Sequence, residues 1–435
     1  MLIPQELPPV DLQRELSDLR AQVAEIRRAQ DDRWTDAARA GQVRAIAADI
    51  LADTSTRVQW AQGAPGAART PLWHSPYGGG KRIISDDGGW TLLFAVTNVS
   101  RFVYADASGP SNSSVDEQTR WGFENRRINL IFAGTVFDPT ISYLLMPQYD
   151  SQPDRWSSAV GTLTPVYAWV AKDLGGGWSV MAGNQNVPWD LQTDYLEGCS
   201  LTAGDYSIFN YRFGIGRNPG VTLERRAEAT RVRGGVFSQL GDQESRWNAP
   251  TNLSFAVAGR AELKFGNVAW DDLEVETSFP DTEPNVVIGV AGAMSNGRAE
   301  NPSSPPTPSI QGVTADVVAR FGGFALEAQG VWMRDAPGAP ELGWSTGAAF
   351  QVSWFALPKL ETFVQGCWMG TSNVPWIAQA GINYYVDGNR LKLTAKAFVP
   401  FGSGDVNGIG QLSGGLGMSA QANNASLVAQ VQVMW

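Results

Sequence analysis

Basic side chains at alternating positions are the feature of this sequence with the most definite chemistry. Arg231 and Arg233 are two residues apart, so an extended strand would place both guanidinium groups on one face. The opposite face would carry Val232, Gly234 and Val236. A guanidinium group offers two parallel donors that match the oxygens of a phosphate or a carboxylate. The spacing therefore predicts a strand with one apolar face and one face that attracts small anions.

The other reactive residue types offer little to a catalytic site. The single histidine, His74, lies outside every predicted strand, which argues against a Ser-His-Asp arrangement or a histidine-rich metal site. No P-loop, paired CxxC or HExxH occurs, and the glycines of 214–220 lack the spacing and context of a dinucleotide site. Cys199 and Cys367 either pair in an oxidising compartment or are two small buried residues. Because the carboxylates are scattered, we predict no enzyme activity, no cofactor and no metal.

The composition limits the class of protein. Of 435 residues, 43% are hydrophobic and 17% are charged, and the 47 glycines and 17 tryptophans suit short strands with tight turns and aromatic belts. No run of about 18 apolar residues occurs, so a transmembrane helix is not expected. The net charge of -10 argues against nucleic acid as a partner.

From Arg82 onward the hydrophobic pattern has a period of two, as expected for β-strands. The segments are about 9 to 11 residues long, which is the length of a tilted strand that crosses a membrane. Aromatic residues such as Trp344 and Trp354 end the apolar face, and tight turns alternate with long polar loops. About 16 candidate strands follow Trp90. We predict an all-β, antiparallel transmembrane barrel of about 16 to 18 strands over residues 82–435.

A barrel of this size encloses an aqueous lumen, which can solvate charged side chains on the face away from lipid. Glu262, Asp316 and Glu327 partly offset the basic charge on that face, so we predict a mild preference for small anions. The alternative is that inward Arg and Glu side chains pair with each other and merely brace the wall. The candidate pore-lining residues are Arg127, Arg217, Arg231, Arg233, Arg260, Lys264, Arg320, Lys392 and Lys396.

The first 52 residues follow a different period. Five apolar residues, spaced alternately by four and three, match the heptad seam of a coiled coil. They are Leu12, Leu16, Leu19, Val23 and Ile26. So short a seam needs partner chains, and we predict an α-helical coiled coil over residues 1–52, followed by a linker over 53–81. The alternative is an amphipathic helix that packs on its own domain.

The chain ends in a strand-like segment whose apolar face finishes with an aromatic residue. That face carries Leu427, Ala429, Val431, Val433 and Trp435. We predict that this strand closes the barrel against the strand near Trp90, with Trp435 at the membrane interface.

Three segments resemble the phosphate-selective porin O and P family. The run from Arg120 to Leu130 is similar to its Gly-Phe-x-x-Arg-Arg strand, with Arg127 as the second Arg of the pair. Residues 183–188 and 213–221 are similar to its Gly-Gln-x-x-x-Pro and Gly-x-Gly-Arg-Asp-x-Gly-Val segments, with Arg217 on the Arg of the second.

This resemblance, over residues 82–435, implies a 16-stranded outer-membrane barrel that forms homotrimers and passes small anions. It also implies that Val431, Val433 and Trp435 form a C-terminal signal read by the barrel-assembly machinery. An N-terminal coiled coil ahead of such a barrel resembles porins of planctomycete-like bacteria. Because lysines are few here, a general porin with a mild anion preference is expected rather than one strictly specific for phosphate.

The function predicted is passive diffusion of small anionic or neutral solutes across an outer membrane, in contact with membrane lipid and lipopolysaccharide. The N-terminal segment is predicted to be periplasmic. The alternative is a structural outer-membrane protein with a plugged barrel, whose coiled coil tethers the membrane to the cell wall. Single-channel conductance separates the two, because a plugged barrel gives no steady current steps.

Deleting residues 1–60 tests the coiled coil. If the seam joins three copies, the deletion should reduce the trimer band on gels of unboiled samples, because the contacts between helices are lost. Trimers as resistant as those of the full chain would contradict this role.

Overall fold

The computed structural model describes residues 20–25, 81–85, 89–105, 120–150, 163–194, 200–238, 240, 255–295, 310–334, 343–370, 376–402 and 425–435. The chain divides into two compact units, residues 1–67 and 68–435. In the first unit, residues 20–25 are helical and the side chain of Val23 is exposed. The other seam residues, Leu12, Leu16, Leu19 and Ile26, lie outside the described residues, so the coiled coil stays a prediction.

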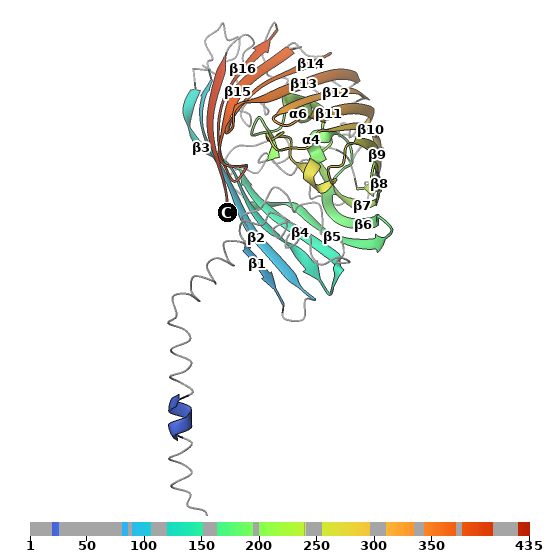
Figure 1. Ribbon diagram of the computed structural model, residues 1–435. Helices are drawn as coiled ribbons and strands as arrows, with labels where there is room; N and C mark the ends of the chain where they lie inside the picture. The colour runs from blue at the N-terminus through green and yellow to red at the C-terminus, as the bar shows by residue number, and fades with distance from the viewer. Residues whose placement is uncertain are drawn as a thin grey trace, which may run out of the picture. The chain divides into compact units, whose positions relative to one another are not determined.

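Strands dominate the described part of the second unit, which contains one antiparallel sheet of 17 strands. Sixteen of them, β2 to β17, pair in sequence order, and β17 returns to pair with β2, so the sheet closes into a barrel (Figure 1). The short strand β1 (Lys81–Ile84) pairs with the start of β2 (Thr91–Ala105). The predicted 16-stranded antiparallel barrel is therefore confirmed.

The remaining strands are β3 (Arg120–Val136), β4 (Asp138–Asp150), β5 (Leu163–Gly175), β6 (Trp178–Asn186), β7 (Arg217–Arg226), β8 (Thr230–Phe237), β9 (Ala256–Phe265), β10 (Asn285–Ser295), β11 (Gln311–Arg320), β12 (Phe324–Arg334), β13 (Trp344–Leu357), β14 (Leu360–Met369), β15 (Trp376–Asp387), β16 (Leu391–Phe401) and β17 (Ser426–Met434). No helix among the residues described here is long and apolar enough to cross a membrane.

Alternation along the strands separates a mainly apolar outer face from a polar and charged inner face. On β9, Leu263 and Phe265 are exposed on the outside, whereas Arg260, Glu262 and Lys264 are buried on the inside. A water-soluble barrel would have the opposite distribution, because apolar side chains would avoid the solvent. The outer face is therefore suited to hydrocarbon.

The two ends of the barrel differ in the connections that the antiparallel order places there. At the turn end, Phe137 alone joins β3 to β4, and residues 358–359 join β13 to β14. The exception at this end is the connection 266–284, which contains the 3₁₀ helix η1 (Asp271–Glu274). We call residues 266–284 the turn-end insert.

At the opposite end, the loop end, residues 187–216 join β6 to β7 and contain α4 (Leu191–Asp194) and α6 (Ile208–Phe213). Figure 1 shows both helices inside the ring of strands. Trp189, Phe213 and Ile215 of this segment are fully buried against wall residues such as Val331 and Ile377. We call residues 187–216 the loop-end insert. The lumen therefore has an apolar core of its own.

The last residue completes the closure of the barrel. The backbone N–H of Trp435 donates to the carbonyl of Val96 (3.0 Å), and the N–H of Val96 donates to the carbonyl of Trp435 (2.9 Å). β1 continues along the same edge of β2, where Lys81 pairs with Phe94. The side chain of Trp435 is 53% exposed.

Replacing Trp435 with serine tests whether this side chain has a role in assembly. The backbone bonds to Val96 remain possible, so we expect less assembled barrel in the membrane fraction but an unchanged conductance per channel. Trp376→Ser is the matched control, because Trp376 is also an exposed outer aromatic (52%). Equal losses in the two variants would leave Trp435 with no special role.

Candidate functional site

Two of the predicted pore-lining lysines hold the loop-end insert. Lys392 and Lys396 are buried on the inner face of β16. Their Nζ atoms donate to the carbonyl oxygens of Leu201 (2.7 Å) and Ala203 (2.8 Å). Both charges are therefore satisfied by backbone dipoles of the insert.

Amide side chains of the wall bind the carbonyls next to these. Asn383 donates to the carbonyl of Thr202 (2.8 Å), and Gln430 donates to that of Gly204 (3.2 Å). Gly204 has a φ of 73°, and a Cβ there would lie 2.7 Å from the Gln430 Nε2 atom. The positive φ favours glycine at this position, since other residues rarely adopt that backbone conformation.

Asp205 follows directly and lies among three guanidinium groups. Its Oδ2 atom is 3.2 Å from Arg126 Nε and 3.7 Å from Arg101 Nη1, and its Oδ1 atom is 3.9 Å from Arg127 Nη2. Arg126 also donates to the hydroxyl of Tyr211 (2.8 Å) in α6. All five side chains are buried. Asp205 therefore clamps the insert to β2 and β3.

A β-bulge makes the two neighbouring arginines available on one face. Asn125 pairs with Ser100 and Arg127 pairs with Val99, so Arg126 is the extra residue of β3. A bulge breaks strict alternation, which allows consecutive side chains to point inward. The sequence pattern predicted Arg127 but not Arg126.

The surrounding charges determine the ionisation of Asp205. Burial alone would raise its pKa, but the charges of Arg126, Arg127, Lys396 and Arg101 hold the pKa well below its ordinary range. The carboxylate is therefore ionised at every pH at which the insert is clamped.

Arg260 and Asp316 form a second ionic contact across the inner wall. Arg260 Nη1 and Nη2 donate to the two carboxylate oxygens of Asp316 (2.6 and 2.7 Å), and Nη1 also donates to the carbonyl of Trp189 (3.2 Å). A Cβ on Gly289 would lie 2.2 Å from Arg260 Nη2. Glycine therefore leaves the space in which the pair and the insert meet.

Glu262 binds both arginines of the alternating pattern, Arg231 and Arg233. Arg231 donates to both of its carboxylate oxygens (2.5 and 2.9 Å), and Arg233 donates to Oε2 (3.2 Å). The guanidinium of Arg231 also lies 4.9 Å from the ring centroid of Trp270, in the turn-end insert. Arg231 therefore contacts the wall and the turn-end insert at once, whereas Arg233 binds the wall.

The turn-end insert is anchored by the remaining candidates. Arg320 donates to the carbonyls of Glu276 and Leu273, each at 3.4 Å. Lys264 donates to the carbonyl of Val268 and lies 5.2 Å from the Trp270 ring centroid.

Glu276 joins the two inserts inside the barrel. Its carboxylate accepts from the backbone N–H of Thr202 (2.5 Å) and from Gln192 Nε2 (3.2 Å), and its own N–H donates to the carbonyl of Ser200 (3.1 Å). The segments that enter from opposite ends of the barrel are therefore hydrogen-bonded to each other.

A cavity of about 90 Å³ remains between the inserts and the wall formed by β4 to β8. Tyr167 and Trp169 line one part of it, and Glu224, Arg231 and Arg233 line another. This cavity is a lumenal space lined by both charged side chains and aromatic rings.

The structure places the nine predicted pore-lining residues inside the barrel or buried at its rim, and seven of them, all except Arg217 and Arg233, have a contact with one of the inserts. Arg217 differs from the others. It shares parity with the outward residues Val221 and Leu223, yet it is buried with its guanidinium 4.8 Å from the Tyr167 ring centroid. Whether the nine residues line a conducting path stays a prediction.

Sequence reasoning missed Arg101, Arg126, Asp205 and Glu276. Arg101 obeys the alternation of β2, so its parity could have identified it. The two acidic residues lie in irregular segments, where no period indicates which way a side chain points. Cys367 is buried and free, and Cys199 lies outside the described residues.

Two solved structures are similar to this chain in fold. Salmonella typhi OmpF in complex with daunomycin aligns with a TM-score of 0.54 and 11% identity, covering 82% of this chain and 100% of that chain. OmpT, an outer membrane protein of Vibrio cholerae in a trimer form, aligns with a TM-score of 0.50 and 10% identity, covering 80% and 100%. No protein-family model and no curated protein matches the chain. The described barrel therefore has the fold of these outer-membrane proteins, and the phosphate-selective family stays a prediction.

Replacing Asp205 with asparagine tests the clamp. The neutral amide keeps the shape but leaves three buried guanidinium groups without their shared carboxylate, so the free energy of unfolding should fall by about 3–5 kcal/mol. Denaturant titration of the refolded barrel measures this. The control is Asp387→Asn, which removes the exposed partner of Arg390 and should have no measurable effect.

The lowered pKa of Asp205 predicts that the difference in stability between the wild-type protein and Asp205→Asn depends on pH. Because the folded-state pKa of Asp205 is lowered, its contribution is present above the ordinary Asp pKa of about 4 and is lost as the pH falls through the lowered value. The free energy of unfolding of the wild-type protein should therefore fall to that of Asp205→Asn only in strong acid. Equal stabilities at pH 7 would contradict the clamp.

Proposed function

We propose that this protein is an outer-membrane channel for small hydrophilic solutes, with a lumen narrowed by two inserts. The observation that carries the proposal is the closed 16-stranded barrel with an apolar outer face and a charged inner face. A closed barrel satisfies its backbone in hydrocarbon, and 16 strands are wide enough to enclose a water-filled path beside the inserts. We place that path along β4 to β8, where the charged cavity lies.

The channel prefers anions, but only mildly. The buried charged side chains of the described residues comprise eleven basic and nine acidic ones, although the whole chain has a net charge of -10. Arg231 and Arg233 line the cavity together with Glu224. Paired charges of this kind leave a small positive excess, which attracts anions without a strong field.

The functional unit is a homotrimer in the outer membrane, with the N-terminal segment in the periplasm. The trimer form of the OmpT structure, which has the same fold, supports the assembly. The heptad seam from Leu12 to Ile26 supports it independently, because a seam of this length needs partner chains.

Planar-bilayer recordings in a salt gradient test the proposal. The full-length protein should give steady current steps and a reversal potential of the sign expected for anions. Arg233→Gln should reduce the anion preference, because Arg233 lines the cavity, whereas Arg225→Gln should not, because Arg225 lies on the outer face. A cation-selective reversal potential would overturn the anion preference.

A plugged structural barrel is the second candidate, and the contact of the two inserts at Glu276 favours it. If the contact seals the lumen, the full-length protein gives no steps, whereas a variant with residues 267–283 replaced by a short glycine linker gives them. Steps of the same size from both proteins would exclude the plug.

A further inference from the structure

One part of the outer face is poorly suited to lipid. Asn98 and Ser100 of β2 point outward between Phe94 and Tyr104, which are exposed on the same face of that strand. Asn125 of β3 is paired in register with Ser100 and also points outward. Three polar side chains therefore lie together between aromatic residues that mark the apolar band.

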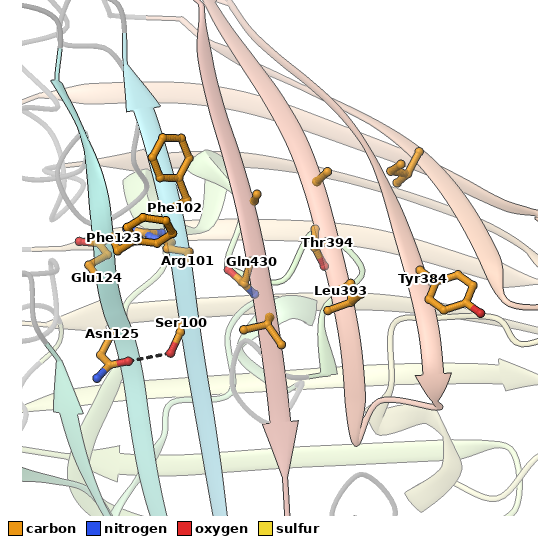
Figure 2. A pocket seen from close by; sticks show the side chains of 14 residues that line it. Ser100, Arg101, Phe102, Phe123, Glu124, Asn125, Tyr384, Leu393, Thr394 and Gln430 are labelled. Atoms are coloured by element: carbon orange, nitrogen blue, oxygen red, sulfur yellow. Dashed lines mark hydrogen bonds and ion pairs between the residues drawn. The ribbon is translucent and has the colours of Figure 1, made fainter.

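These side chains do not satisfy one another. Ser100 Oγ donates to Asn125 Oδ1 (2.6 Å), as the dashed line in Figure 2 shows. Among the described residues, no group accepts a hydrogen bond from the two N–H donors of the Asn125 amide. In the same part of the chain, no group donates to the buried Oδ1 atom of Asn98. Hydrocarbon chains cannot supply the missing partners, so leaving this surface in lipid is unfavourable.

The same surface is hollowed. A groove of about 720 Å³ crosses β15, β16, β17, β2 and β3. Phe102 and Phe123 stand on one side, with ring centroids 5.1 Å apart, and Tyr384 stands on the other (Figure 2). Ala395 and Ala429 have short outward side chains between them, and these make the hollow.

A second hollow on the outer wall provides a contrast. It has a volume of about 900 Å³ and lies over β8 to β12. The outward residues around it are glycine, alanine, valine and tryptophan, among them Gly259, Ala315 and Trp332. Acyl chains can fill this second hollow without leaving a polar group unpaired.

We propose that a second copy of this chain docks in the groove between β15 and β3, and that its polar groups pair with the exposed amide of Asn125. The proposal rests on the homotrimer proposed above and names its interface. A protein partner supplies hydrogen bonds within a membrane, which lipid tails cannot. In a closed ring of identical copies, each copy receives one neighbour in its groove and places another part of its surface in the groove of the next copy. The exposed ring of Phe123 (86%) in the groove and that of Trp121 (73%) beside it add apolar area.

Substitutions on the outer face test the interface without touching the lumen. Ala429→Trp fills the groove and should shift refolded protein from trimer to folded monomer, as measured by analytical ultracentrifugation in detergent. Ala315→Trp adds the same bulk to the second hollow and should leave the trimer intact.

Asn125→Leu distinguishes protein from lipid as the occupant. If lipid covers the groove, removing a polar group from the membrane face leaves the assembly unchanged or more stable. If a second copy covers it, the lost hydrogen bonds weaken association by about fivefold at each contact. Unchanged trimers in both Ala429→Trp and Asn125→Leu, or a wild-type protein that is monomeric, would overturn the interface.

Bilayer recordings keep this inference separate from the proposed function. Folded Ala429→Trp monomers that still give steps of wild-type size would support the interface and leave the channel proposal standing. A wild-type trimer without conductance would reject the channel, while the ultracentrifugation results would still decide the interface.

Discussion

The structure depends on one constraint, which is that every backbone donor and acceptor of the wall finds its partner within the wall. Hydrocarbon offers none, so the first and last strands must meet. Trp435 and Val96 exchange the last pair of hydrogen bonds, and β1 covers the part of β2 that β17 does not reach. Because the ladder is closed, alternation assigns most side chains of the strands to the inside or the outside. The apolar outer face and the charged lumen are therefore consequences of the same closure.

Closure also explains why the inner charges act as structural anchors. A lumen this wide would be filled with water if nothing entered it, and its basic residues would then be solvated. Here Lys392, Lys396 and Arg260 bind backbone carbonyls of the loop-end insert, and Arg320 binds those of the turn-end insert. Each such bond satisfies a cation and fixes an irregular segment that has no ladder of its own. The inserts are thus held by the wall as much as by their apolar core.

The sequence was sufficient to predict the barrel, because alternation over about 16 segments leaves few other solutions. The inward positions of Arg231, Arg233 and Arg260 follow from the same alternation. Alternation does not predict the positions of two other residues. Arg126 points inward because of a bulge, and Arg217 is buried by a contact with Tyr167 despite its outward parity. Both depend on neighbouring strands, which no local period encodes. The inserts were missed for a related reason, since a long polar connection looks the same whether it enters the lumen or remains outside.

The arrangement of charge limits how selective such a lumen can be. A cation that is already bound to a carboxylate or a carbonyl presents little of its field to a passing ion. Arg231 and Arg233 both bind Glu262, and three arginines lie around Asp205, so each of these cations already has a carboxylate neighbour. Strict recognition of a phosphate would need guanidinium donors that are held open for the ligand. Donors that hold an insert cannot bind the ligand unless the insert is displaced. The mild preference proposed above is compatible with the contacts that stabilise the inserts, whereas a strong preference would require some of those contacts to be given up.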